Sequence, residues 1–202
     1  MAKEATKKPA AAKASKPASR SRTKAQPVAE PNTLRVLGWV TLVILLLDQI
    51  TKYYVVHILR LDLVREIEVL PPWINFHMAW NQGINFGLFR SSEDIVRLGL
   101  IALSLLICAA LYIWMRRTRP GWPSQLAAGL LIGGAIGNVI DRIYYGAVAD
   151  FLNMSLPNWR NPYSFNVADI AIFLGAFGLI LMPPQGRDAD KDKTRDAPSK
   201  SG

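Results

Sequence analysis

Four stretches of the chain are apolar and almost free of charge. The cleanest is 95–115, where Arg97 is the only charged residue, and at about 1.5 Å per residue it covers the roughly 30 Å of a hydrocarbon core. Segments 36–59 and 124–145 are similar, and 167–182 is shorter and is followed by two prolines. The pattern predicts an α-helical integral membrane protein with four transmembrane helices.

The first apolar stretch follows a basic region, as the core of a secretory signal peptide does. It is longer than such a core, and no convincing small-residue cleavage site follows Leu59. We therefore interpret 36–59 as an uncleaved membrane helix.

The segment between the first two predicted helices carries a second pattern. Residues 74–81, INFHMAWN, alternate apolar and polar positions like a half-buried strand, and VREIEVL before Pro71 does so more loosely. Trp73 and Trp80 suit a membrane interface. We expect a small β-type cradle on the membrane surface between helices 1 and 2, with a plain loop as the alternative.

The net charge of +9 is unevenly placed. Residues 1–32 are rich in Lys, Ala, Pro and Ser and predict a disordered basic arm; 185–202 predict a disordered charged tail, which leaves 33–184 as the membrane domain. The arm suits anionic lipid headgroups better than nucleic acid, so membrane lipids are expected partners and nucleic acid is not.

Basic residues also predict the orientation of the helices. With four spans, the arm, Arg35 and the cluster at 116–119 fall on one side, whereas 60–94 and 146–165 balance their arginines with Asp and Glu. The positive-inside rule then places both termini in the cytoplasm. The two balanced segments face the other side, which in a bacterium is the periplasm.

Several kinds of site are not indicated. Cys108 is the single cysteine, so it can form neither an intrachain disulfide nor a cysteine metal cluster, and we expect it to be a packing residue. His57 and His77 show no metal-ligand spacing, and no nucleophile elbow or phosphate-binding glycine loop is present. We expect neither a metal nor another cofactor.

Polar residues recur at one end of the predicted helices. Counting residues from the cytoplasmic side places Asp48, Lys52, Asn138, Asp141 and Asp169 in the outer half of the bilayer. Each charge at a helix centre costs on the order of 2.5–3.5 kcal/mol on insertion scales, so several at one level indicate a functional site. The alternative is that ion pairs such as Asp48 with Lys52, or Asp141 with Arg142, only hold helices together.

The third predicted helix combines a packing surface with polar groups. Gly129, Gly133 and Gly137 recur every four residues, which lets another helix approach closely. Asn138 comes directly after the last of these glycines, with Asp141 and Arg142 at i+3 and i+4, which places three polar side chains on a common face at the end of this close contact.

Asp150 and Asp169 have no basic residue within four positions. The stretch from Phe151 to Phe165 can loop out and return, which would bring the two carboxyl groups together. Two carboxyls in a partly dry site divide their roles, because one keeps a proton while the other activates water. The spacing permits an aspartic-protease type of dyad.

Four blocks occur in order on this frame: DQITK at 48–52, NQGINFG at 81–87, GNVIDR with GAVADF at 137–151, and NVADIA at 166–171. Together they resemble the signature blocks of the lipoprotein signal peptidase family, also called signal peptidase II, over about residues 36–183. That family consists of bacterial inner-membrane aspartic endopeptidases. They remove the signal peptide from prolipoproteins, cutting on the N-terminal side of the cysteine that carries diacylglycerol.

The resemblance implies roles for particular residues. It implies that Asp150 and Asp169 are the catalytic pair and that 60–94 helps to hold the substrate. The residues that it implies for substrate binding or support of the site are Asp48, Lys52, Asn81, Gly83, Asn138, Asp141, Arg142 and Asn166. Asn85 stands where the family often has alanine, and Ile170 where a small hydroxyl residue is common.

Two other functions remain open from the residues alone. A small proton- or solute-transporting membrane protein would also carry carboxylates within its helices, although we find no internal repeat of the kind that transporters show. A non-enzymatic assembly factor would use polar residues only to join helices. That reading leaves Asp150 and Asp169 without a role.

Overall fold

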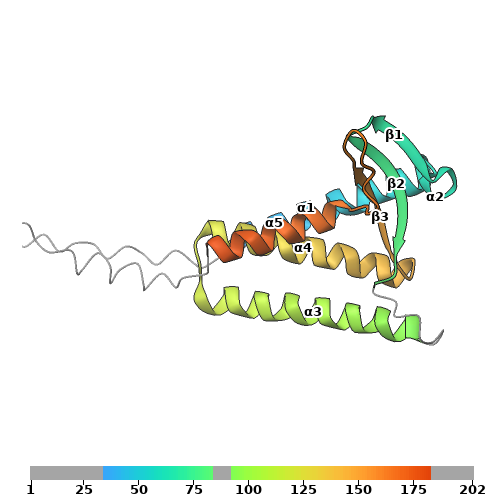
Figure 1. The fold of residues 1–202 in the computed structure, drawn as a ribbon. Coiled ribbons are helices and arrows are strands. Elements are labelled where there is room, and N and C mark those ends of the chain that lie inside the picture. The colour runs from blue at the N-terminus through green and yellow to red at the C-terminus, as the bar shows by residue number, and fades with distance from the viewer. Residues whose placement is uncertain (1–33, 84–91, 183–202) are drawn as a thin grey trace, which may run out of the picture. The chain divides into compact units, whose positions relative to one another are not determined.

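The computed structural model describes residues 34–83 and 92–182 and consists of a helical bundle with a small sheet at one end (Figure 1). Helix α1 spans Arg35–Tyr53 and continues as a π-helix, η1, over Tyr54–Ile58. Helix α3 spans Ser92–Thr118, α4 spans Trp122–Tyr144 and α5 spans Val167–Leu181. Helix α4 packs against all three of the others.

All four predicted helices are present, and among the described residues three of them are long and apolar enough to cross a membrane: Arg35–Ile58, Asp94–Thr118 and Trp122–Tyr144. Helix α5 has 15 residues, which at about 1.5 Å each cover about 22 Å, less than a typical hydrocarbon core. The fold is therefore that of a membrane protein with three such helices, and the fourth crossing stays a prediction.

The glycines of α4 confirm the predicted close approach of another helix, and that helix is α1. A Cβ added at Gly133 would lie 2.8 Å from the carbonyl oxygen of Thr41, and one at Gly129 would lie 2.8 Å from the Cβ of Val40. On the α5 side, a Cβ at Gly134 would lie 2.4 Å from the carbonyl oxygen of Ala168. The small residues thus let α4 lie in backbone contact with helices on two sides.

The sheet has three antiparallel strands in the order β1-β2-β3. Strands β1, Glu66–Leu70, and β2, Ile74–Asn81, confirm the predicted strand pattern in this segment, and a short helix α2, Leu61–Val64, precedes them. Strand β3, Val148–Met154, comes from the segment after α4 and was not predicted. Its first four residues are all buried, so it lacks the alternation that marks a half-exposed strand.

The sheet is joined to the bundle by its own apolar core. Val55 and Val56 of η1 and Leu61 of α2 pack with Met78 of β2 and Phe151 of β3. This core fixes β3, and with it Asp150, at the end of α1 and α4. Cys108 belongs to a second core between the helices, which confirms it as a buried packing residue.

The predicted basic arm and charged tail lie outside the described residues, and so does Asn85. The predicted return of the chain after Asp150 is present. The backbone N–H of Phe151 donates to the carbonyl oxygen of Phe165 at 2.9 Å, and Leu152 and Phe165 exchange two further bonds. This pairing places Asn166, the N-cap residue of α5, beside β3.

Candidate active site

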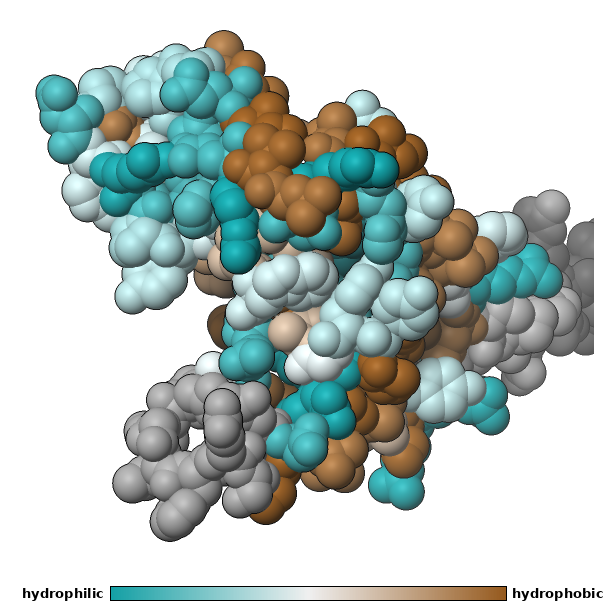
Figure 2. All heavy atoms as spheres, turned by 90° about the vertical axis from the view of Figure 1, so that its right-hand side faces the viewer, coloured by the Kyte–Doolittle hydropathy of each residue, from teal (hydrophilic) through white to brown (hydrophobic). Residues whose placement is uncertain are grey.

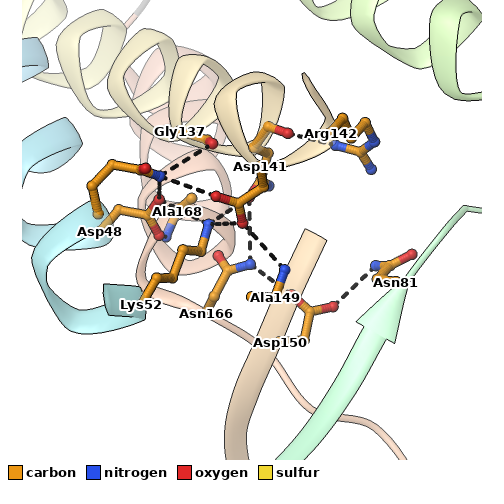
Figure 3. A network of polar contacts seen from close by, with 12 residues as sticks. Asp48, Lys52, Asn81, Gly137, Asp141, Arg142, Ala149, Asp150, Asn166 and Ala168 are labelled. Carbon is orange, nitrogen blue, oxygen red and sulfur yellow. Dashed lines mark hydrogen bonds and ion pairs between the residues drawn. The ribbon is translucent and has the colours of Figure 1, made fainter. Parts of the chain in front are cut away.

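Polar side chains from α1, α4, β3 and the start of α5 meet at the end of the bundle that carries the sheet (Figure 3). Asp169 is held there by the local sequence of α5. The side chain of Asn166 accepts from the backbone N–H of Asp169 at 2.8 Å, and the Asp169 carboxylate accepts from the backbone N–H of Asn166 at 3.3 Å. This reciprocal capping box fixes both residues at the first turn of the helix.

Lys52 lies at the centre of a buried ion cluster. Its Nζ is 2.8 Å from Oδ2 of Asp48 and 2.8 Å from Oδ2 of Asp141, and it also donates to Oδ1 of Asn138 at 3.2 Å. The Lys52 side chain is 2% exposed, and the two carboxylates are 0% and 1% exposed. The interpretation of Asp141 and Arg142 as an ion pair is therefore wrong, because Asp141 pairs with Lys52 across the helix interface.

Both carboxylates of this cluster also bind backbone amides. The N–H of Ala168 donates to Oδ1 of Asp48 at 3.0 Å. The N–H of Ala149 donates to Oδ2 of Asp141 at 3.1 Å. Each alanine directly precedes one of the two predicted catalytic aspartates.

Asp150 and Asp169 have neutral amide partners instead. Asn166 donates to Oδ1 of Asp150 at 2.6 Å, and Asn81 donates to Oδ2 of Asp150 at 3.0 Å. Asn138 donates to Oδ1 of Asp169 at 2.9 Å. Asn138 and Asn166 are themselves joined by a hydrogen bond of 3.4 Å, so a pair of amides connects the two carboxyl groups.

The environment of Asp150 favours its protonated form. The pKa of Asp150 is raised from 3.8 to about 7, mainly by burial and secondly by the negative charge of Asp169. The hydrogen bonds from Asn81 and Asn166 and the charge of Lys52 oppose this shift. A carboxyl that titrates near neutral pH is suited to acid and base catalysis.

Asp150 and Asp169 line the same cavity, which has a volume of about 600 Å³. Asn81 also lines it, while the remaining wall is largely apolar and comes from the β3 region and α5: Met154, Tyr163, Ser164, Phe165, Ile170, Phe173 and Leu174. Figure 2 looks at the sheet-bearing end of the molecule and shows apolar residues gathered among polar ones there. The cavity can therefore hold an apolar group beside two carboxyls.

Two further predicted residues lie at the edge of the site. Nη1 of Arg142 donates to the carbonyl oxygen of Asn138 at 3.3 Å. Gly83 has a φ of +94°, and its N–H donates to Oδ1 of Asn81 at 3.0 Å. A Cβ at Gly83 would lie 2.7 Å from Leu100 of α3, so a glycine here permits both the turn after β2 and its contact with α3.

Gln49 belongs to the site but was not predicted. Its Nε2 donates to Oδ2 of Asp48 at 3.1 Å, to Oδ1 of Asp141 at 3.1 Å and to the carbonyl oxygen of Gly137 at 3.4 Å. The one available signal was its position next to Asp48 in the DQITK block.

Comparison with known proteins covers the same part of the chain. The family model described as signal peptidase (SPase) II matches residues 40–183. A lipoprotein signal peptidase of Methylobacterium radiotolerans is 41% identical over 77% of this chain and 90% of its own length. One of Rhodopseudomonas palustris is 37% identical over 74% of this chain and 91% of its own length.

A solved structure of a bacterial membrane enzyme also matches. It superposes with a TM-score of 0.61 and 24% identity, over 73% of this chain and 91% of the other. At that identity the match concerns the fold. The family model and the relatives therefore span the helices and strands that build the cavity.

Proposed function

The chain belongs to the signal peptidase II family, and from that premise we propose that it is an aspartic endopeptidase that removes the signal peptide from prolipoproteins in a bacterial membrane. The observation that carries the aspartic mechanism is that Asp150 and Asp169 line one cavity and accept hydrogen bonds only from neutral donors among the described residues. The family model and the relatives give no support to the transporter alternative.

The two carboxyls divide the chemistry. Below about pH 7 Asp150 carries a proton, because its pKa is raised to about 7, and Asp169 acts as the carboxylate. Asp169 takes a proton from a water molecule, whose oxygen attacks the scissile carbonyl carbon, while Asp150 gives its proton to the carbonyl oxygen. In the second step Asp169 gives its proton to the amide nitrogen, Asp150 takes a proton back from a hydroxyl of the tetrahedral intermediate, and the C–N bond breaks, leaving a carboxyl on the signal peptide and an amine on the mature chain.

Asn138 and Asn166 orient the two carboxyl groups for these different roles. Each donates one N–H to one of the aspartates, and the two amides are joined to each other. Because an amide N–H requires an acceptor, these bonds direct one oxygen of each aspartate toward the amide pair. The lone pairs of the two carboxyl groups that accept none of these bonds, and the proton of Asp150, remain available to water and substrate.

The substrate we propose is a prolipoprotein whose cleavage-site cysteine carries diacylglycerol, with the cut on the N-terminal side of that cysteine. The apolar wall formed by Ile170, Phe173 and Leu174 supports this choice, because it continues from the carboxyls along α5. Apolar walls with few polar groups are typical of sites that bind apolar ligands.

For the arrangement in the membrane we propose four spans, with α5 as the fourth, and both termini in the cytoplasm. Arg116 and Arg117 at the end of α3 support this orientation through the positive-inside rule. The sheet and the dyad then lie near the periplasmic surface of the inner membrane. Water can reach the carboxyls there while the lipid chains of the substrate stay in hydrocarbon.

The proposal is tested with the purified full chain in liposomes. Two forms of one prolipoprotein, with and without diacylglycerol on the cysteine, are incubated with it, and the products are identified by mass. We expect cleavage of the lipidated form on the N-terminal side of the cysteine. Equal cleavage of both forms would show that the lipid is not recognised, and no cleavage of either would reject the peptidase assignment.

A further inference from the structure

The two predicted catalytic aspartates are anchored in the same way. The residue before each one is an alanine whose backbone N–H donates to a fully buried carboxylate: Ala149 to Asp141 and Ala168 to Asp48. The first bond fixes β3 to α4, and the second fixes the start of α5 to α1. The positions of the two aspartates therefore depend on the positions of two other carboxylates.

Asp48 and Asp141 are held together by two bridges. Lys52 contacts Oδ2 of both at 2.8 Å, and Nε2 of Gln49 lies 3.1 Å from Oδ2 of Asp48 and 3.1 Å from Oδ1 of Asp141. One ammonium group faces two buried carboxylates, so the cluster keeps one formal negative charge and the carboxylates repel each other. An amide that donates to both offsets this repulsion without adding a charge.

The bridge from Gln49 needs a close approach of α1 and α4. A Cβ at Gly137 would lie 2.5 Å from Oδ2 of Asp48, so a larger residue would displace that carboxylate. Nε2 of Gln49 also reaches the carbonyl oxygen of Gly137 at 3.4 Å. Figure 3 shows Asp48, Gly137 and Asp141 beside the strand that carries Asp150.

We propose that Gln49 is a positioning residue that, together with Lys52, sets the separation of Asp150 and Asp169 by joining Asp48 to Asp141. This inference rests on the proposed function of the dyad. Gln49 is hydrogen-bonded to neither catalytic aspartate in the part of the chain that the structure describes. Its effect passes through the two backbone amides, and a displacement of about 1 Å at reacting groups costs on the order of 10²-fold in rate.

The experiment compares two variants of Gln49 in the full chain in liposomes. Gln49→Met keeps the length of the side chain but has no N–H donor, and Gln49→Lys keeps a donor that can reach both carboxylates. We expect kcat of Gln49→Met to fall by about 10- to 100-fold with KM within about twofold of the parent. We expect Gln49→Lys to keep kcat within about fivefold of the parent.

Thr51→Val is the matched control, because Thr51 is on the same helix and, among the residues that the structure describes, its hydroxyl bonds only to carbonyl oxygens of that helix, at 2.8 and 2.9 Å. Its kcat should equal that of the parent. Thermal unfolding of each variant establishes that the compared proteins are folded. If Gln49→Met does not fold, the test rests on Gln49→Lys alone. A kcat within about fivefold of the parent then supports the inference, and a larger loss overturns it.

The inference is overturned if Gln49→Met keeps the parent's kcat, or if Gln49→Lys loses as much kcat as Gln49→Met. A loss that appears in KM alone would overturn it as well, since it would place Gln49 in substrate binding. Asp150→Asn is assayed in parallel. If that variant still cleaves, the proposed dyad fails; if it is inactive while Gln49→Met is fully active, only the role of Gln49 fails.

Discussion

The structure brings two pairs of aspartates to one end of the bundle, and the pairs differ in their partners. Asp48 and Asp141 share the ammonium group of Lys52 and are completely buried. Asp150 and Asp169 receive hydrogen bonds from amides and line a cavity of about 600 Å³. The same side chain thus occurs once in a closed ionic cluster and once at a cavity with neutral hydrogen-bond donors.

This difference decides what each pair can do. A carboxylate that is paired with a buried cation holds the structure together, because removal of either partner leaves an uncompensated buried charge. A buried carboxyl with neutral partners has a raised pKa, about 7 for Asp150, and can exchange a proton near neutral pH. The chemistry is therefore expected at one pair and the rigidity that it needs at the other.

The largest effect on stability is expected for Lys52→Met, which leaves two buried carboxylates without a cation. Removal of one partner of a buried ion pair costs about 3–5 kcal/mol. We expect a much lower thermal midpoint in detergent and no detectable cleavage. Arg97→Met is the matched control, because its partner Asp94 is 75% exposed, and pairs of that kind contribute about 0–1 kcal/mol.

If Arg97→Met destabilised the protein as much as Lys52→Met, the distinction between the closed cluster and the surface pair would be wrong.

An intermediate effect is expected for Asn166→Ala, which removes a donor to Asp150 and the cap of α5. The lost cap costs about 1 kcal/mol, and the displaced carboxyl costs about 10²-fold in kcat. Thermal unfolding and steady-state cleavage measure the two separately. Asn153→Ala is the comparison, since Asn153 is also buried but donates to carbonyl oxygens of the loop after β3.

Asn153→Ala should lower stability and leave kcat of the folded enzyme near that of the parent. Equal kcat values for the two asparagine variants would contradict a specific role for Asn166.

The smallest effect is a shift in pH dependence on Asn81→Leu. The hydrogen bond from Asn81 favours the ionised form of Asp150 and so lowers its pKa; without that bond the pKa of Asp150 rises from its value of about 7. Because Asp150 must be protonated to act as the acid, activity falls as pH rises through this pKa. The basic limb of the kcat/KM profile should therefore move to higher pH, and a shift to lower pH would contradict the assignment.

The sequence predicted the parts of the site that depend on local pattern. The apolar runs predicted four helices, the glycines of α4 predicted a close contact with another helix, and alternation predicted β2. The return of the chain between Phe151 and Phe165 was also foreseen, because the two motifs around Asp150 and Asp169 bracket it. These features are set by residues near one another along the chain.

The parts that were missed depend on contacts between distant segments. Asp141 pairs with Lys52 of another helix although Arg142 is its neighbour in sequence, and Gln49 joins α1 to α4. Strand β3 was missed because burial of both faces removes its alternation. Neither a helical pattern nor a strand pattern carries information on which side chain of another element faces a given carboxylate.

We expect Asp150 and Asp169 to carry the reaction while the Asp48–Asp141 cluster supports them. The decisive measurement is kcat for Asp150→Asn and Asp169→Asn on a diacylglyceryl-modified prolipoprotein, at equal amounts of folded protein. Each change leaves a side chain of the same size but removes the acid or the base, so we predict a loss of at least about 10³-fold for each. Retention of a tenth or more of the parent's kcat by either variant would show that Asp150 and Asp169 do not both carry the reaction.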